Sequence, residues 1–186
     1  MTRKITLLII FGINFLFFSI CKADSWLQNT SFIVTSKWGS CYAKSIPDED
    51  FGIKGKTFIF KAEKEKDTLI DQYDWYSRSL YLLEGSQGVL VVRLFYTPAG
   101  HTLKDLNAIA FFRGGKLLRE YTVLDIISDP KKIIHSTSSI HIFDKIHGFE
   151  WDENKNFVFV VETVDGRTLF FDTDTGEMRL KNKERN

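Results

Sequence analysis

Cysteine and proline are scarce in this chain, with two and three residues respectively among 186. One cysteine, Cys21, lies in an apolar stretch near the N-terminus that has the features of a removable export signal, so that Cys41 is left alone. A lone cysteine forms no internal disulfide, which excludes a small cystine-stapled domain and leaves packing as the source of stability. A Pro-, Gly- or Ser-rich linker is also lacking. We therefore predict one domain over 24–180, followed by a polar tail over 181–186.

An excess of charge of one sign is lacking as well. The chain has 25 Lys and Arg residues against 24 Asp and Glu residues, a formal net charge of +1. Removal of residues 1–23 leaves 22 basic residues against the same 24 acidic ones, a net charge of −2. A nearly neutral protein has no long-range field that attracts polyanions. The one basic concentration, 179–185, is short and interrupted by Glu184. We expect no nucleic-acid partner.

The N-terminal residues have the pattern of an export signal. Arg3 and Lys4 are basic, residues 5–20 are apolar apart from three polar side chains, and Cys21 and Ala23 are small residues at the −3 and −1 positions of a cleavage site. We predict cleavage after Ala23, so that the mature chain begins with the next residue.

Two alternatives for this segment stay open. The apolar run is shorter than the about 20 residues of a spanning helix, but a tilted, uncleaved anchor is one alternative. Acylation of Cys21 as in a lipoprotein is the other, although Ile20 before it is bulky. With cleavage, we expect a protein free of the membrane. An exported domain of this size without disulfides fits a bacterial periplasm or bacterial secretion.

Short apolar runs rich in β-branched and aromatic residues, separated by tight turns, dominate the remaining chain. They predict a mostly β fold, an antiparallel single domain rich in hairpins. The Asp-Gly pair in the last complete hairpin is typical of a type I′ turn. The predicted strands are Ser31–Ser36, Cys41–Ile46, Thr57–Ala62, Thr68–Tyr73, Ser79–Leu83, Val89–Tyr96, Ala108–Arg113, Lys116–Tyr121, Phe157–Thr163, Arg167–Asp172 and Glu177–Leu180.

Two segments depart from the strand pattern. Thr102–Asn107 and Thr122–Ile127 each open with Thr and have Asp three residues later, close to the chemistry of a capping box. They predict one or two short connecting helices. Asp129-Pro130 bounds the second one, because proline disfavours helical geometry in the residue before it.

The hairpins recur about every 45 to 50 residues, which raises a repeat architecture such as propeller blades. The segment 168–180, TLFFDTDTGEMRL, resembles the closing hairpin of a blade in quinoprotein-type propellers. Those families repeat the motif in every blade, whereas it occurs once here, so no cofactor or binding residue is carried over. From the residues alone we expect Asp172 and Thr175 to hydrogen-bond amides within the turn, and Gly176 to take a positive φ.

Residues 39–43, Gly-Ser-Cys-Tyr-Ala, resemble the nucleophile segment of papain-like cysteine hydrolases. The resemblance implies that Cys41 is a nucleophile, activated by a histidine such as His101. Thr35 stands where the family has its oxyanion-hole glutamine, and Trp38 stands where it has a second cysteine. A place beside a hairpin turn instead of a helix start favours a structural thiol.

Other patterns predict weaker sites. Asp71, Asp74, Trp75 and Tyr76 combine acids with rings, as a carbohydrate-binding corner does, although such rings also fill cores.

Three histidines, His135, His141 and His147, are spaced six residues apart, about 20 Å along a strand, too far to share one metal unless the chain doubles back. The segments beginning at Asp152 and Asp172 alternate oxygen-bearing residues as calcium loops do, but neither completes the pattern. We expect no metal and no cofactor.

Two functions follow from these observations. The first is an exported, noncatalytic β-domain that binds a protein or surface component, since no catalytic set stands out. The second is a small exported cysteine hydrolase that uses Cys41 with a histidine such as His101.

Overall fold

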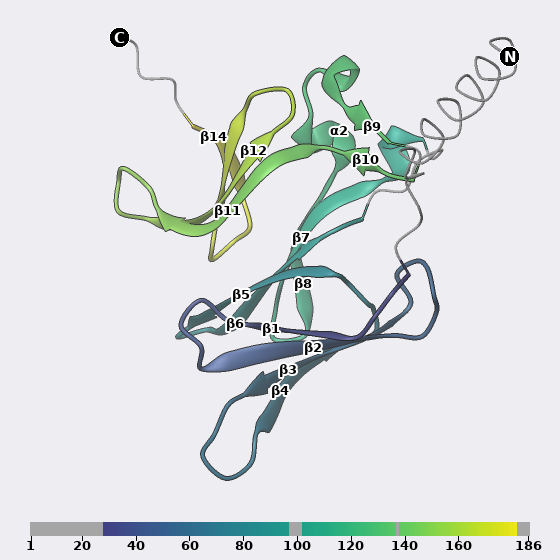
Figure 1. Cartoon of the computed structure of the whole chain (residues 1–186). Coiled ribbons are helices and arrows are strands. Elements are labelled where there is room, and N and C mark those ends of the chain that lie inside the picture. Colours follow the sequence, from purple (N-terminus) through teal and green to yellow (C-terminus); the bar gives the residue numbers. More distant parts are fainter. Residues whose placement is uncertain (1–27, 97–101, 137, 182–186) are drawn as a thin grey trace, which may run out of the picture.

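The computed structural model describes residues 28–96, 102–136 and 138–181. The fold is mostly β, as the sequence predicts, with three four-stranded antiparallel sheets and one two-stranded sheet (Figure 1). The predicted signal and its cleavage site, His101 and the tail beyond residue 181 lie outside the described residues.

Each four-stranded sheet is a meander, in which consecutive strands of the chain are hydrogen-bonded neighbours. Sheet 1 consists of β1 (Phe32–Thr35), β2 (Cys41–Pro47), β3 (Gly55–Lys61) and β4 (Thr68–Tyr73). Sheet 2 consists of β5 (Ser79–Gly85), β6 (Gly88–Leu94), β7 (Asn107–Arg113) and β8 (Lys116–Thr122). Sheet 3 consists of β11 (Phe143–Trp151), β12 (Phe157–Thr163), β13 (Thr168–Asp172) and β14 (Met178–Leu180).

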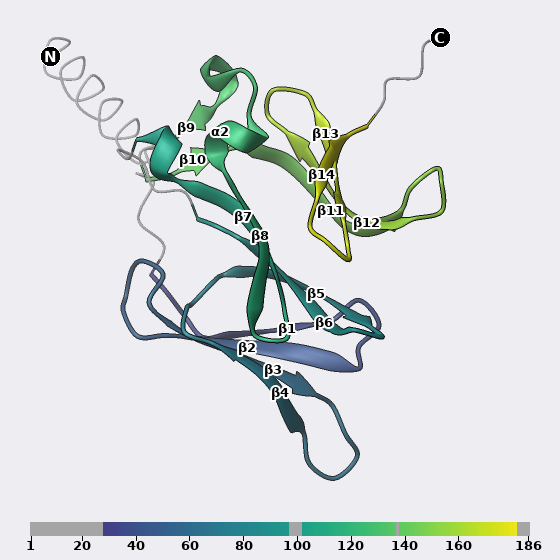
Figure 2. The same cartoon turned by 180° about the vertical axis from the view of Figure 1, so that it is seen from behind.

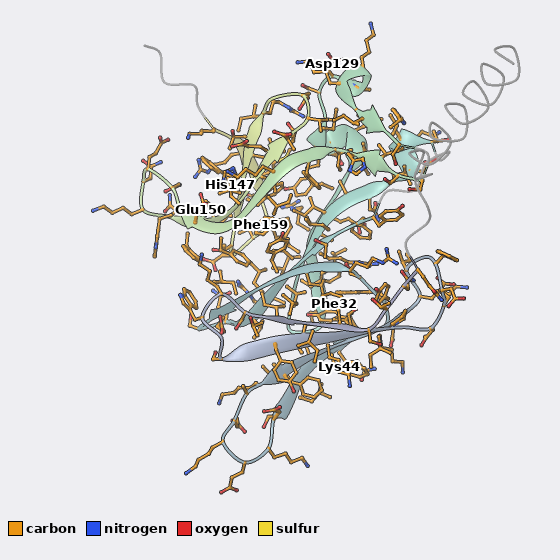
Figure 3. The ribbon with its side chains drawn as sticks, viewed as in Figure 1. Phe32, Lys44, Asp129, His147, Glu150 and Phe159 are labelled. Carbon is orange, nitrogen blue, oxygen red and sulfur yellow. The ribbon has the colours of Figure 1, made fainter. Side chains whose placement is uncertain are left out.

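The three sheets follow one another in space as they do in the chain, with sheet 2 in the middle (Figures 1 and 2). Because side chains alternate between the faces of a strand, sheet 2 has an apolar set on each face. Figure 3 shows Phe32 between sheets 1 and 2, Phe159 between sheets 2 and 3, and Lys44 on the outer side of sheet 1. The core between sheets 1 and 2 includes Cys41, Ala43, Ile59, Leu80, Leu82, Val91 and Phe112, and the larger core between sheets 2 and 3 includes Leu90, Val92, Ile109, Phe111, Phe149, Phe159, Leu169 and Phe171.

One of the two predicted helices has the expected cap. In α2 (Val123–Ile126), the Thr122 hydroxyl accepts from the amide of Asp125, and the Asp125 carboxylate accepts from the amide of Thr122, which is a complete capping box. The other predicted helix is only a 3-10 turn, η1 (Leu103–Asp105), because Thr102 makes no side-chain cap and Asn107 already belongs to β7. A second 3-10 turn, η2 (Pro130–Lys132), begins at the predicted proline boundary.

The sequence interpretation missed one strand and one hairpin, and it assigned one turn type wrongly. The long strand β11 and the small hairpin of β9 (Ile134–His135) and β10 (Ile140–His141) were not predicted, because polar residues and histidines interrupt the apolar pattern there. The turn between β12 and β13 is not type I′: Gly166 has φ +84, but Asp165 does not have a positive φ. The amide of Gly166 donates to the carbonyl of Thr163 at 2.8 Å, which fits a three-residue loop with glycine in the left-handed position.

The turn that follows β13 is as predicted. Oδ1 of Asp172 accepts from the amides of Asp174 and Thr175 at 2.9 and 2.8 Å, and the Thr175 hydroxyl accepts from the amide of Glu177. Gly176 has φ +74, and a Cβ there would lie 2.9 Å from the Cβ of Arg119 in β8. Glycine is therefore required both by the turn and by the close approach of sheet 3 to sheet 2.

Candidate ligand-binding pocket

A cavity of about 540 Å³ lies where the first strands of the three four-stranded sheets begin. It is lined by residues just before β1, at the start of β5 and at the start of β11, together with the end of β6 and the loop between β2 and β3. This volume falls in the range of small-molecule sites, about 300 to 1,000 Å³. The described lining residues are Asn29, Phe51, Gly52, Ile53, Tyr76, Ser77, Arg78, Ser79, Arg93, Leu94, Phe95, Tyr96, Ser139, Ile140, His141, Ile142, Phe143 and Ile146.

The walls of the pocket are mainly apolar, and their charges are of one sign. Aliphatic and aromatic side chains come from all three sheets and their connecting loops. Two arginines and one histidine line the pocket, and none of the described lining residues is Asp or Glu. The arrangement combines a hydrophobic surface with the positive charges of two arginines.

Arg93 is the most unusual of these residues. It follows Val91 and Val92 in β6, and the pairing of β6 with its neighbours points its side chain to the sheet 1 side, whereas Leu94 packs on the sheet 3 side. Only 5% of its surface is exposed. The guanidinium carbon lies 4.5 Å from the ring centre of Trp75 and 4.3 Å from that of Phe95, so that two cation–π contacts hold it.

The hydrogen bonds of Arg93 are incomplete. Its Nη2 donates to the carbonyl oxygen of Tyr76 at 2.9 Å, while its buried Nε has no hydrogen-bond partner among the described residues. Within the same residues, Arg93 makes no ion pair with a carboxylate within 4.0 Å. Burial lowers the pKa of Arg93 to about 10, an effect that the more distant charge of Glu120 opposes. The side chain is still cationic at neutral pH.

The rim of the pocket is tied together by polar contacts. Nε of Arg78 donates to Oδ1 of Asn29 at 3.1 Å. The side-chain amide of Asn29 in turn donates to the carbonyl oxygens of Glu49 and Gly52. These bonds hold the loop between β2 and β3 beside the start of sheet 2.

Ser139 and His141 lie together on the sheet 3 side of the pocket, with Oγ of Ser139 3.1 Å from Nε2 of His141. The Ser139 hydroxyl is also 2.9 Å from that of Ser136. No described carboxylate makes an ion pair with His141. The contact therefore lacks the third group that orients the base in a nucleophile–base–acid arrangement.

A smaller groove, of about 200 Å³, lies at the opposite ends of the same first strands. Trp38, in the turn after β1, stacks on Phe157 of sheet 3 with ring centres 5.8 Å apart, and Trp151 at the end of β11 packs on the same ring at 4.8 Å. The two indoles are 62% and 69% exposed. The groove has charges of both signs at its edge, in Glu84, Arg113 and Asp174.

The structure places Cys41 at the start of β2, 4% exposed and part of the core between sheets 1 and 2. Its sulfur lies 3.8 Å from the hydroxyl of Ser40, and its amide donates to the hydroxyl of Ser36. No described histidine contacts it. His101, its predicted partner, lies outside the described residues.

The residues of the predicted carbohydrate corner do not share one exposed surface. Tyr76 is buried and donates its hydroxyl to the carbonyl oxygen of Thr30. Trp75 packs between Tyr73, Phe112 and Arg93. Asp71 is half-buried, burial raises its pKa, and its Oδ2 has no hydrogen-bond partner among the described residues, whereas Asp74 is exposed. Instead, the carbonyl oxygen of Tyr76 accepts a hydrogen bond from Arg93, and the ring of Trp75 packs against the Arg93 guanidinium.

The candidate metal patterns have other roles. His135 and His141 lie in the paired strands β9 and β10, and Nε2 of His147 in β11 is 2.8 Å from Oε1 of Glu162. Asp152 accepts from the amides of Asn154 and Asn156 and forms an ion pair with Arg179. Within the described part of the chain, no group of three or more His, Cys, Asp or Glu residues could hold a metal ion.

Sequence reasoning did not single out Arg93. Its signal is present in the run 89–96, Val-Leu-Val-Val-Arg-Leu-Phe-Tyr, where one charged residue interrupts an otherwise apolar strand. A charged side chain in such a strand is expected to be buried, and burial of a charge is costly unless another group pairs with it. That partner could not be inferred, because Trp75 and Phe95 meet Arg93 only in the folded sheets.

Within the described residues, no helix has the length and apolar character needed to cross a membrane. No protein-family model, no curated protein and no solved structure matches the chain.

Proposed function

We propose that this chain is an exported, noncatalytic β-domain that binds a small ligand in the pocket between its sheets. The observation that carries the proposal is the 540 Å³ cavity, whose walls are largely apolar and come from three separate sheets. A pocket of this size with a few convergent polar groups is the usual form of a small-molecule site. The fold positions the walls through its cores, so the pocket exists without a ligand-induced rearrangement of the strands.

The polar groups at the pocket support binding more than catalysis. Ser139 and His141 make the one hydroxyl–imidazole contact among its described lining residues, and they lack an orienting carboxylate. A hydrolase would need a nucleophile, a base and a stabiliser of the developing charge in one place. Hydrolysis of a small ester by the wild type, lost in Ser139→Ala, would contradict the noncatalytic assignment.

The cysteine hydrolase hypothesis depends on a different part of the molecule. Cys41 lies in a strand and inside a core, so it has neither the helix start of a cysteine hydrolase nucleophile nor the exposure that would admit a substrate. We expect the folded protein to react slowly with a thiol reagent near neutral pH. Rapid reaction in the native state would favour the hydrolase.

Export is tested separately, by N-terminal sequencing of the protein recovered from outside the cytoplasm. The basic start, the apolar run and the small residues before the cut predict a mature chain that begins near Asp24. A product that still begins at Met1, or one that carries a lipid on Cys21, would contradict cleavage after Ala23.

Ligand binding is tested with a neutral fluorescent probe, N-phenyl-1-naphthylamine, and the mature protein. Ser79 lines the pocket at the start of β5, so Ser79→Phe places a ring in the cavity, and we expect the probe to bind at least about tenfold more weakly. Ser86→Phe is the matched control, since Ser86 lies in the turn at the far end of β5, beside the smaller groove. Equal probe affinity in both variants and the wild type would contradict the pocket as the binding site.

A further inference from the structure

We infer that the ligand of this pocket is an amphipathic anion: an apolar body that lies between the sheets and an acidic head that pairs with Arg93. This inference rests on the proposed function and specifies its ligand class. The shared chemistry of the head is a carboxylate or a phosphate monoester, both of which match the planar donor edge of a guanidinium.

The first support is the charge of the pocket. Arg93 lines it as a buried cation that forms no ion pair with a described residue, and none of the described lining residues is Asp or Glu. A neutral apolar ligand would leave this positive charge uncompensated next to its own surface. An anion would be attracted to the same place that a cation would avoid.

The second support is the state of the Arg93 side chain. It is nine-tenths or more buried, it forms no ion pair with a described residue, and its Nε has no hydrogen-bond partner there. A buried charge without a counter-ion is costly, so proteins seldom retain one without a partner. A ligand anion at the guanidinium would supply the missing counter-charge.

The third support is the orientation of the guanidinium. Trp75 and Phe95 cover it with ring centres 4.5 and 4.3 Å from its central carbon, and the Tyr76 carbonyl takes one of its five N–H groups. The contacts fix the side chain, so that little rotamer freedom is lost when an anion binds. A lysine at the same position would lack both the planar stacking and the two-pronged donor edge.

The apolar body has a place beside this head group. Leu94 and Phe95 follow Arg93 in the chain and line the pocket. Ile140 of β10 and Ile142, between β10 and β11, line it as well. Acidic head and apolar chain would thus be bound in one continuous cavity, with Arg93 at the sheet 1 side of β6 and the hydrocarbon against the sheet 3 side.

The test compares ligands that share one chain and differ in the head. Dodecanoate, dodecyl phosphate, dodecanol and dodecyltrimethylammonium are titrated below their critical micelle concentrations into the mature protein by calorimetry. We expect at least one of the two anions to bind about 10- to 100-fold more tightly than the alcohol, the factor expected of a hydrogen bond to a charged group. The phosphate and carboxylate arms distinguish the two head groups.

Variants then assign the preference to Arg93. Arg93→Met should bring the anions down to the affinity of the alcohol while leaving alcohol binding within about twofold, and Arg93→Lys should keep only part of the preference. Arg113→Met is the matched control, because Arg113 is a mostly buried arginine at the smaller groove and donates to the carbonyl oxygen of Thr173. We expect it to leave the preference unchanged.

The outcomes separate the two levels of the proposal. If alcohol and anions bind equally, or the ammonium binds best, the ligand class is wrong while the pocket stands. If no ligand of the series and no neutral probe binds, the proposed function fails as well. Because the preference is measured in the wild type, it is decided even where a variant does not fold.

Discussion

Asp165 and Arg93, two buried charges of opposite sign, lie in opposite kinds of surroundings. Asp165 lies in the turn between β12 and β13, and its side chain is 1% exposed. Its carboxylate accepts from the amide and the hydroxyl of Ser128, at 2.7 and 2.8 Å, and from the hydroxyl of Thr163. Arg167 completes the set with its Nε 3.2 Å away.

These bonds join two parts of the fold. Ser128 follows α2, and Arg167 also donates to the carbonyl oxygen of Ile126 at the end of that helix. The charge of Asp165 thus links the helix to sheet 3. Its negative charge is balanced by hydrogen bonds from the protein itself. Arg93 has no such set: one carbonyl, two rings and no carboxylate among the described residues.

The difference separates a structural charge from one that is available to a ligand. A buried charge that serves the fold is saturated by groups that fold with it, as Asp165 is. A buried charge whose donors remain unused stabilises the fold less than it could, and the proposed binding role would supply the missing partner of Arg93. The comparison predicts a large loss of stability when Asp165 is replaced and almost no change when Arg93 is replaced.

The largest effect is expected for Asp165→Ala. The change removes the acceptor of several hydrogen bonds and leaves Arg167 without its carboxylate, so the free energy of unfolding should fall by about 3 to 5 kcal/mol. Urea unfolding measures it. Asp174→Ala is the control, because Asp174 is mostly exposed and pairs with Arg113 at 3.6 Å, and it should cost less than about 1 kcal/mol. Equal costs would remove the distinction between the two kinds of charge.

The same carboxylate should govern part of the acid sensitivity. Burial alone would raise the pKa of Asp165, but its hydrogen bonds outweigh burial and hold the pKa well below the usual value. A group whose pKa is lower in the folded state contributes stability that is present above its unfolded pKa, about 4, and is lost as the pH falls further. Stability should therefore decline below about pH 4 in the wild type.

The Asp165→Asn variant isolates this contribution. Its acid decline should be shallower than that of the wild type, measured as the urea midpoint from pH 5 to pH 2. The decline should not vanish, because hydrogen bonds that outweigh burial also lower the pKa values of Glu84 and Asp152. Parallel curves for variant and wild type would mean that Asp165 is not the group that titrates.

A smaller effect is expected in the turn that carries Asp165. Gly166 has φ +84 and open space around a would-be Cβ, so the cost of a side chain there comes from the backbone alone. Gly166→Val should lower the free energy of unfolding by about 1 to 2 kcal/mol, and Gly166→Asn by less, because Asn tolerates the left-handed region. Thermal melts of the two variants decide it, and identical losses would contradict this turn geometry.

The sequence predicted the strands of sheets 1 and 2 because short runs rich in β-branched and aromatic residues are separated by turns that contain glycine or a cluster of charges. It predicted the capping box of α2 and the turn of Asp172 from local chemistry, which depends on neighbours in the chain. It missed β11, where His147 and Gly148 interrupt the apolar pattern and two register shifts occur in the pairing with β12. Irregular pairing of this kind depends on the partner strand and leaves little local signal.

The pocket could not be predicted for the same reason. Its walls come from residues as far apart as Asn29 and Ile146, and they meet only because three meanders pack with their first strands beginning at one end. The sequence predicts a binding role for the rings of Trp75 and Tyr76. Their contacts with Arg93, a cation–π contact and a hydrogen bond to the Tyr76 carbonyl, depend instead on the packing of sheet 1 on sheet 2. The position of a site between sheets depends on how the sheets pack, which the sequence of each strand does not reveal.

The smallest effect on stability is expected for Arg93→Met, which sharpens the comparison with Asp165 most. Methionine fills a similar volume among Trp75 and Phe95 without a buried charge, and replacing an unpaired buried charge by an apolar side chain is often neutral or stabilising. The lost bond to the Tyr76 carbonyl and the lost cation–π contacts oppose this gain. The free energy of unfolding without ligand should therefore change by no more than about 1 kcal/mol in either direction. Urea unfolding beside Asp165→Ala measures both on one scale. A loss for Arg93→Met as large as that for Asp165→Ala would show that Arg93 holds the fold together, and the reason for assigning it to a ligand would disappear.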